Sequence, residues 1–284
     1  MNYRLPFTLL LVFVVGVPAL ANEIDALKTP GDVNAFIKKV HPDDFSEFSL
    51  DEKSPSTTEF GKNTFHKVDL DGDGATDLVV EAEYLFVIKA TTGGTFKLRF
   101  IDRGPFRKYS LVRILNKPGE TDLVIGPVKD APPANTDAET TILWKFDGFI
   151  ETNPKPDALK IEKISFSTGG CFGTCPIFDL VIGPERRSTY NAKKFNNPDG
   201  KFTGTIEAKA YDQLVETINY LKLAELRPDY SVPWTDDQGS TLTITHDGGK
   251  VKTIHDYGMI GTFGLANLYD QLSALRKTQK WSPQ

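Results

Sequence analysis

Residues 65–80 read FHKVDLDGDGATDLVV, and the spacing of the acidic side chains in this run predicts a cation-binding loop. Four aspartates stand at positions 1, 3, 5 and 9 of the loop, namely Asp69, Asp71, Asp73 and Asp77. Ca²⁺ takes about six to eight hard oxygen ligands, and alternate carboxylates supply several of them if the backbone turns sharply. Gly72 and Gly74 permit the positive φ angles that such a turn requires. An apolar run follows, which indicates that the loop leads into a strand.

A backbone carbonyl at position 7 would complete the predicted calcium site, which comprises Asp69, Asp71, Asp73, Ala75 and Asp77. An EF-hand requires a bidentate glutamate at position 12, but Val80 stands there. The spacing DxDxDGxxD instead resembles the calcium loops of FG-GAP/VCBS-type β-hairpins, which implies a structural Ca²⁺. The alternative is a solvated Asp/Gly-rich turn without metal.

The first 21 residues are typical of a secretory leader. Arg4 precedes an apolar stretch at residues 7–17, and the sequence PALA at residues 18–21 ends in an A-x-A cleavage signal. We therefore expect an exported protein, periplasmic or secreted, that begins at Asn22 and has no lipoprotein anchor. No later run approaches the roughly 20 apolar residues of a membrane span.

The net charge bounds the partners. A formal charge of −5 argues against nucleic acid and against anionic membrane surfaces. An envelope protein or a glycan remains as the expected ligand, and the sequence leaves the oligomeric state open.

Residues 22–152 predict a β-rich domain. Thr29 and Pro30 open one short helix, and Pro42 ends it. Residues 64–149 contain short apolar runs separated by turn signals, which predicts an antiparallel β-meander. About seven strands with one Asp loop are too few for a propeller. The two prolines of residues 152–156 predict a stiff connector between domains.

Residues 157–284 predict an α+β domain. Ile161–Phe166 and Ile177–Ile182 alternate as strands do, and Asp247-Gly248 closes a hairpin. Apolar residues at helical spacing predict one helix over 208–226 and another around 265–275. The expected architecture is an antiparallel sheet with two amphipathic helices on one face.

The chain has two cysteines, Cys171 and Cys175, within the run GCFGTCP. In an exported chain such a pair predicts a disulfide. The Cα atoms must then approach to about 4.4–6.8 Å, and Gly173 permits the necessary turn. GCFGTCP, with the later runs WTDDQGSTLTI and LYDQLSALRKTQKW, resembles an uncharacterised bacterial family of exported proteins known only as a domain of unknown function. The resemblance covers roughly residues 161–281 and implies no activity.

The motif Cys-x-x-x-Cys-Pro also resembles that of Sco-type copper chaperones, which implies copper or thiol-redox chemistry with His246 or His255 as a further ligand. Those proteins place the cysteines between a strand and a helix, whereas here a strand follows. His255 and Asp256 are adjacent on a predicted strand and should point to opposite faces, so they do not suggest a catalytic pair. Residues 234–239 predict a polar loop, with a binding loop or a second cation site as the alternatives.

No catalytic motif stands out in the sequence. The leading hypothesis is therefore a non-enzymatic binding or structural protein of the cell envelope with a structural Ca²⁺ loop. A copper-binding or thiol-redox protein that uses Cys171 and Cys175 is the first alternative. The second is a hydrolase whose site the sequence does not reveal.

Overall fold

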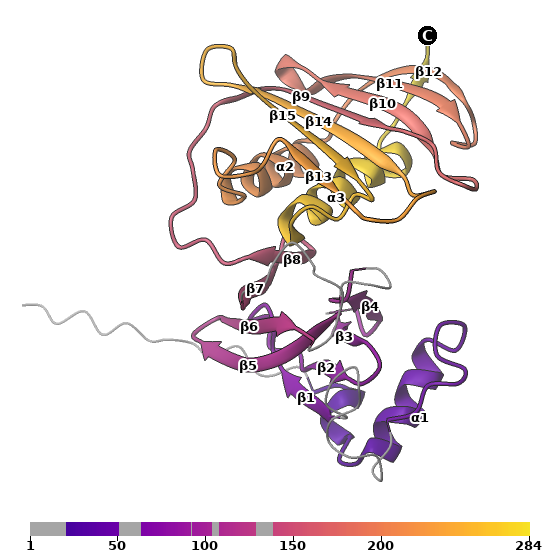
Figure 1. Ribbon diagram of the computed structural model, residues 1–284, viewed down its shortest axis with the longest axis vertical. Coiled ribbons are helices and arrows are strands. Elements are labelled where there is room, and N and C mark those ends of the chain that lie inside the picture. Colours follow the sequence, from indigo (N-terminus) through magenta and orange to yellow (C-terminus); the bar gives the residue numbers. More distant parts are fainter. Residues whose placement is uncertain (1–20, 51–63, 92, 104–107, 129–138) are drawn as a thin grey trace, which may run out of the picture.

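The computed structural model describes residues 21–50, 64–91, 93–103, 108–128 and 139–284 (Figure 1). The described part is β-rich, with two small antiparallel sheets in the N-terminal half, a larger sheet in the C-terminal half and three α-helices. This confirms the predicted fold class. Apart from Ala21, the predicted leader lies outside the described residues. Within the described part, no helix is both long and apolar enough to cross a membrane.

Two four-stranded sheets make up the N-terminal half, where the sequence predicted a single meander. The first sheet consists of β1 (Thr64–Val68), β2 (Asp77–Glu81), β3 (Leu85–Ala90) and β4 (Phe96–Phe100), paired in chain order. The second consists of β5 (Tyr109–Lys117), β6 (Glu120–Pro127), β7 (Thr140–Lys145) and β8 (Gly148–Glu151). The short helices η1 (Glu23–Ala26) and α1 (Pro30–Val40) precede both sheets.

The first sheet is the middle layer of this half. Leu78 and Val80 pack in one core with residues of η1 and α1, whereas Val79 packs in another core with residues of the second sheet. Strands β2 and β3 are consequently buried on both faces along their whole length. A charged residue within either strand must therefore find a partner inside the protein.

An eight-stranded sheet dominates the C-terminal half, in the order β13-β15-β14-β9-β10-β11-β12-β16. The strands are β9 (Ile161–Thr168), β10 (Ile177–Ile182), β11 (Arg187–Lys194), β12 (Gly200–Thr205), β13 (Asp229–Ser231), β14 (Gly239–His246), β15 (Lys250–Tyr257) and β16 (Ser282–Pro283). All neighbouring strands are antiparallel except β13 and β15. The turn η2 (Pro184–Arg186) joins β10 to β11.

Helices α2 (Ala208–Tyr220) and α3 (Phe263–Thr278) cover one face of this sheet (Figure 1). Alternate strand residues such as Ile164 and Phe166 point into the core beneath the sheet, where they meet Leu214 and Leu268 of the helices. The predicted helix over 208–226 is too long. The chain leaves α2 after Tyr220 because Lys222 adopts a left-handed conformation with a φ of 52°.

The start of α3 joins the two halves. The Glu151 carboxylate accepts hydrogen bonds from the Phe263 and Gly264 amides at 2.6 and 3.0 Å. A carboxylate there also faces the positive end of the helix dipole. Ile150 packs in the core beneath the large sheet, and a Cβ at Gly264 would lie 2.8 Å from its side chain. The β7–β8 hairpin thus pairs within the N-terminal sheet while it packs against the C-terminal core.

Candidate functional site

The Asp loop, residues 69–76, is the connection between the antiparallel strands β1 and β2. Gly72 and Gly74 have φ angles of 73° and 83°, as the predicted turn requires. Gly72 is needed for a second reason, because a Cβ there would lie 2.3 Å from the Gly119 carbonyl oxygen. The Asp loop therefore packs tightly against the β5–β6 turn.

Aspartate carboxylates hold the backbone of this loop. Asp69 accepts hydrogen bonds from the Gly72 and Gly74 amides at 2.8 and 2.9 Å. Asp77, which is fully buried, accepts from the Leu70 amide at 2.9 Å and from the Ala90 amide at 2.8 Å. Burial raises the pKa of Asp77 above its usual range, although the two amides and Lys89 oppose the shift. The loop conformation is thus built around its own acidic side chains.

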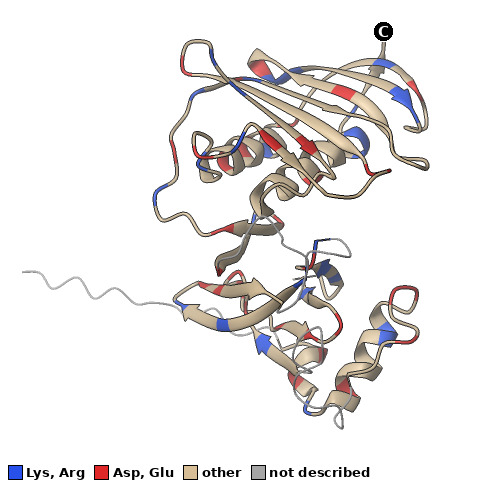
Figure 2. Ribbon diagram, in the orientation of Figure 1, with Lys and Arg blue, Asp and Glu red and all other residues tan. Residues whose placement is uncertain are grey.

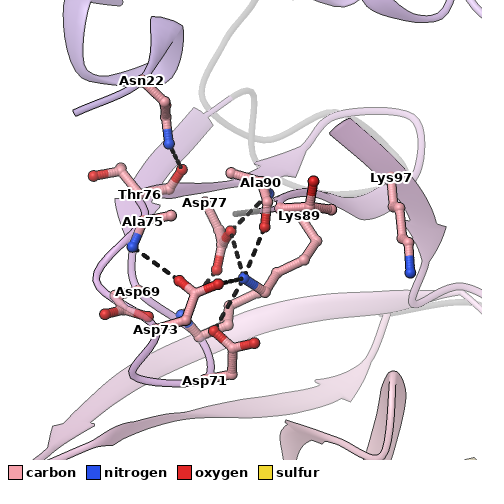
Figure 3. A network of polar contacts seen from close by, with 12 residues as sticks. Asn22, Asp69, Asp71, Asp73, Ala75, Thr76, Asp77, Lys89, Ala90 and Lys97 are labelled. Atoms are coloured by element: carbon pink, nitrogen blue, oxygen red, sulfur yellow. Dashed lines mark hydrogen bonds and ion pairs between the residues drawn. The ribbon is translucent and has the colours of Figure 1, made fainter. Parts of the chain in front are cut away.

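A buried lysine enters the loop from the neighbouring strand β3 (Figure 3). The Lys89 Nζ atom lies 3.0 Å from Asp71 Oδ1, 3.2 Å from Asp73 Oδ2 and 3.3 Å from Asp77 Oδ1. It also donates a hydrogen bond to the Ala90 carbonyl at 2.9 Å. Burial acts to lower the pKa of Lys89, but Asp77 and Asp71 outweigh it, and the net shift is upward. Lys89 therefore carries its charge among the carboxylates.

Three of the five predicted calcium ligands come together in the structure. Asp69, Asp71 and Asp77 each offer a carboxylate oxygen, and these atoms lie within 4.8 Å of one another. Asp73 contacts Lys89 and also accepts a hydrogen bond from the Ala75 amide at 2.8 Å. The donors are hard oxygens, which suit Ca²⁺, and the cluster already surrounds a positive charge. The residues fit the ion on the condition that the Lys89 ammonium withdraws.

The Cys loop, residues 169–176, connects β9 to β10. Cys171 and Cys175 lie at disulfide distance, with Cα atoms 5.8 Å apart. The Gln238 side-chain amide donates to the carbonyls of Gly169 and Pro176, each at 2.8 Å. Phe172 at the tip is 89% exposed. The Cys loop is therefore fastened at its base and presents an apolar ring at its tip.

In the part of the chain that the structure describes, no histidine joins this cysteine pair in a metal-binding group. Among the described residues, the grouping of three or more metal-ligating side chains is that of Asp69, Asp71 and Asp77. His246 pairs with Ile161, at the end of β9 away from the Cys loop. His255 is exposed and contacts Thr241 at 3.0 Å, whereas Asp256 is buried and accepts the Gly261 amide at 2.7 Å. These two side chains thus face opposite ways.

Residues 234–239 support the Cys loop. Asp237 accepts hydrogen bonds from the Trp234 indole at 3.0 Å and from the Gln238 amide at 2.8 Å. The Asp236 carbonyl accepts the Phe172 amide at 2.9 Å. The polar groups of this segment are used to join two loops, which agrees with a polar structural loop.

A groove of about 690 Å³ opens at the end of the large sheet where α3 terminates. We call it the aromatic groove; its lining includes Pro176, Tyr190, Phe195, Asn196, Asn197, Pro198, Phe202, Arg276, Lys277, Gln279 and Trp281. The ring centroids of Tyr190 and Phe202 are 5.7 Å apart in a stacked arrangement, and Trp281 lies 5.2 Å from Tyr190. Aromatic faces beside two cations form an amphipathic surface. Figure 2 shows basic segments both on α3 and on the adjoining end of the sheet.

Local structure positions these side chains. Trp281 lies over Gly204 of β12, where a Cβ would approach the indole to 3.1 Å and the Lys280 carbonyl to 2.7 Å. Arg276, in the last turn of α3, donates to Asn196 Oδ1 at 3.2 Å and lies 4.7 Å from the centre of the Phe178 ring. Burial raises the pKa of the Tyr190 phenol, which donates to Asn196 at 3.0 Å. Both a glycine and part-buried polar contacts thus shape the groove.

Sequence reasoning missed the groove and Lys89. A lysine inside the apolar run LFVIKA was the available signal, since a cation in a doubly buried strand demands acidic partners. For the groove, Tyr190 and Phe202 lie directly opposite one another on β11 and β12. That pairing is not visible before the strands are placed.

Comparison with known proteins matches residues 162–276 to the family described as Domain of unknown function (DUF6438). The matched range contains the Cys loop, most of the large sheet and all but the last two residues of α3. No curated protein and no solved structure matches the chain. The likeness of the Asp loop to FG-GAP/VCBS hairpins stays a prediction.

Proposed function

We propose that this protein is an exported, non-enzymatic binding protein of the cell envelope and that the aromatic groove is its ligand site. The observation that carries the proposal is the combination of aromatic faces with Arg276 and Lys277 in one groove of about 690 Å³. Apolar lining with a few placed polar groups is typical of sites that hold small ligands. Most of this lining belongs to the family domain.

The ligand class that the groove fits best is a glycan that bears carboxylates. The flat faces of Phe195 and Trp281 suit the apolar side of a sugar ring, and the side-chain amides of the groove suit its hydroxyls. The guanidinium of Arg276 presents donors in a planar fork that matches a carboxylate. The local positive charge of Arg276 and Lys277 favours an acidic ligand, although the chain as a whole is acidic.

The test is a titration of the mature protein with oligogalacturonate, followed by calorimetry and by tryptophan fluorescence. A neutral malto-oligosaccharide of equal length should bind at least about tenfold more weakly, a difference of ~1.4 kcal/mol. Arg276→Lys keeps the charge but removes the fork, and should weaken acidic binding by about tenfold. Arg187→Gln is the matched control, because Arg187 is an exposed cation on β11 that pairs with Glu185.

Two results would overturn this assignment. Equal affinity for both glycans would show that Arg276 does not select for carboxylates. Absence of binding to either glycan would refute a glycan as the ligand. Tighter binding of a peptide through its C-terminal carboxylate would reassign the groove to an envelope protein.

The Asp loop supports the N-terminal half in this proposal, with Ca²⁺ bound by Asp69, Asp71, Asp73, Ala75 and Asp77. Oxygen donors from one loop support it. Thermal stability should then rise in millimolar Ca²⁺ by mass action, and Asp71→Ala should abolish the rise. An unchanged melting curve would refute the calcium proposal and leave the groove untouched.

Export and a structural disulfide complete the proposal. The Cys pair at disulfide distance is compatible with an oxidising compartment, and the strand β10 that follows it does not favour the copper or thiol-redox alternative. Intact-mass measurement of protein made with its leader should give a chain that begins at Asn22. Its mass should be lower than that of the reduced chain by two hydrogen atoms. Two free thiols would favour the alternative.

We also propose two domains, residues 22–152 and 157–284, joined by the connector that carries Pro154 and Pro156. The fragment 159–284 should fold cooperatively, and its stability should not change when Ca²⁺ is added. Because Ile150 and Glu151 contact α3, a fragment that starts at residue 139 should be more stable. If only the longer fragment folds, the β7–β8 hairpin belongs to the C-terminal domain.

A further inference from the structure

The Lys89 ammonium lies where the carboxylates of the Asp loop converge (Figure 3). Three of its four oxygen contacts are to Asp71 and Asp73 of the loop and to Asp77 at the start of β2, and all four are between 2.9 and 3.3 Å. The Lys89 side chain is 5% exposed and the Asp77 side chain is not exposed at all. The ammonium is therefore a buried counter-ion of the carboxylate cluster, and it is supplied by a different strand.

The oxygens that Lys89 uses are those that a metal ion would need. Asp71 Oδ1 and Asp77 Oδ1 each contact the ammonium. A Ca²⁺ ion would have to approach such oxygens to about 2.3–2.6 Å. Two positive charges cannot share this cluster without strong repulsion. Because the ammonium nitrogen already lies 3.0 Å from Asp71 Oδ1 and 3.3 Å from Asp77 Oδ1, a Ca²⁺ ion that binds these oxygens would have to displace it.

We propose that the Lys89 ammonium is the resident cation of the Asp loop and competes directly with Ca²⁺, so that it sets the calcium affinity of this protein. The inference rests on the calcium site proposed above. It explains how a loop with four aspartates closes without metal. It also places the wild-type Kd in the weak extracellular range of roughly 10⁻⁴–10⁻³ M.

The test compares wild type, Lys89→Met and Lys97→Met in calorimetric titrations with CaCl₂. Methionine has a similar length and no charge, so Lys89→Met removes the competitor and keeps the buried stem. Lys97 lies directly opposite Lys89 on β4, but it is half-exposed and pairs with Asp147 outside the loop. We expect Lys89→Met to bind Ca²⁺ at least about tenfold more tightly than wild type, and Lys97→Met to bind as wild type does.

Thermal melting gives a second readout. Without metal, Lys89→Met should melt below wild type because its carboxylates lose their counter-ion, and Ca²⁺ should raise its Tm more than that of wild type. If Lys89→Met does not fold without metal, the wild-type protein itself supplies the test. The NMR signal of its Lys89 NH₃⁺ group should change as CaCl₂ saturates the loop.

The outcomes separate the two proposals. Equal Ca²⁺ affinities for wild type and Lys89→Met, or an unchanged ammonium signal at saturation, would overturn competition and leave the calcium site standing. Failure of both proteins to bind Ca²⁺ would overturn the calcium site and the competition with it. Tight binding by Lys89→Met alone would establish both.

Discussion

The Asp loop and the Cys loop are held closed by different kinds of interaction. Each joins two antiparallel strands through a stretch of the same length, at residues 69–76 and 169–176. The first is closed by carboxylates, amides and the Lys89 ammonium, and the second by the cysteine pair at its tip and Gln238 at its base. Charge closes a loop only as long as every buried partner remains, whereas a covalent link acts mainly on the unfolded chain. Removal of a single side chain should therefore cost more in the Asp loop.

The largest effect is expected from Asp77→Ala. This change leaves the buried ammonium of Lys89 with less compensation and takes the acceptors from the Leu70 and Ala90 amides. Breaking a buried ion pair costs about 3–5 kcal/mol, so the free energy of unfolding in urea should fall by that amount. Asp71→Ala is the control, since its side chain is partly exposed and makes one contact with Lys89. A loss below ~1 kcal/mol for Asp77→Ala would show that charge does not close the loop.

The buried carboxylate of Asp102, which lies outside both loops, tests the effect of buried charge through the pH dependence of stability. Asp102 is buried and accepts the Tyr109 amide at 2.7 Å and the Leu85 amide at 3.0 Å, with Lys108 at 4.0 Å. Burial raises the pKa of Asp102 from 3.8 to about 6, although both amides oppose the shift. The folded protein then binds the proton more tightly than the unfolded chain. Stability should consequently fall as the pH rises from about 4 to about 6, by up to roughly 3 kcal/mol.

Asp102→Asn isolates this contribution from the other buried carboxyls. The asparagine side chain offers one oxygen acceptor to the two amides, so the variant should be less stable than wild type at low pH. Its stability should also fall less steeply with rising pH, because the contribution of Asp102 is absent. Urea unfolding at several pH values between 3.5 and 7 measures the difference. Parallel profiles for the two proteins would contradict the assignment.

The Cys loop should respond less to substitution. Replacing both cysteines by serine removes a short covalent loop, which restricts the unfolded chain by only roughly 2 kcal/mol. Wild type in reductant should match the double variant, and neither result should depend on Ca²⁺. A loss as large as that of Asp77→Ala would mean that the Cys loop also determines the native packing.

The smallest effect is expected at Phe172. The side chain is 89% exposed, so Phe172→Ser should change the free energy of unfolding by less than about 0.5 kcal/mol. A larger loss would indicate that the ring contacts the rest of the protein in solution.

Periodicity and turn chemistry predicted much of this fold. The strand Ile177–Ile182 is found with the predicted bounds, because one of its faces is buried and the other is half-exposed. The second N-terminal sheet was not separated from the first, since the division depends on which strands pair. Strands β11 and β12 were missed because polar and small residues such as Thr189 and Gly204 weaken their apolar alternation.

The candidate sites likewise differ in how far the sequence alone predicts them. The Asp loop is local in sequence, so the spacing of Asp69, Asp71 and Asp77 was enough to predict that they converge. Lys89 reaches it from another strand, and the aromatic groove combines β11, β12 and the residues after α3. Such sites depend on strand register and helix packing, which the sequence does not show.

The anchored start of α3 has a mechanical consequence. Glu151 and Arg103 hold one end of this helix to the N-terminal half, and Arg276 at the other end lines the aromatic groove. At about 1.5 Å per residue, its 16 residues span about 24 Å. The length of α3 therefore sets the distance between a ligand in the aromatic groove and the N-terminal sheets. One turn inserted into α3 would increase that distance by about 5 Å.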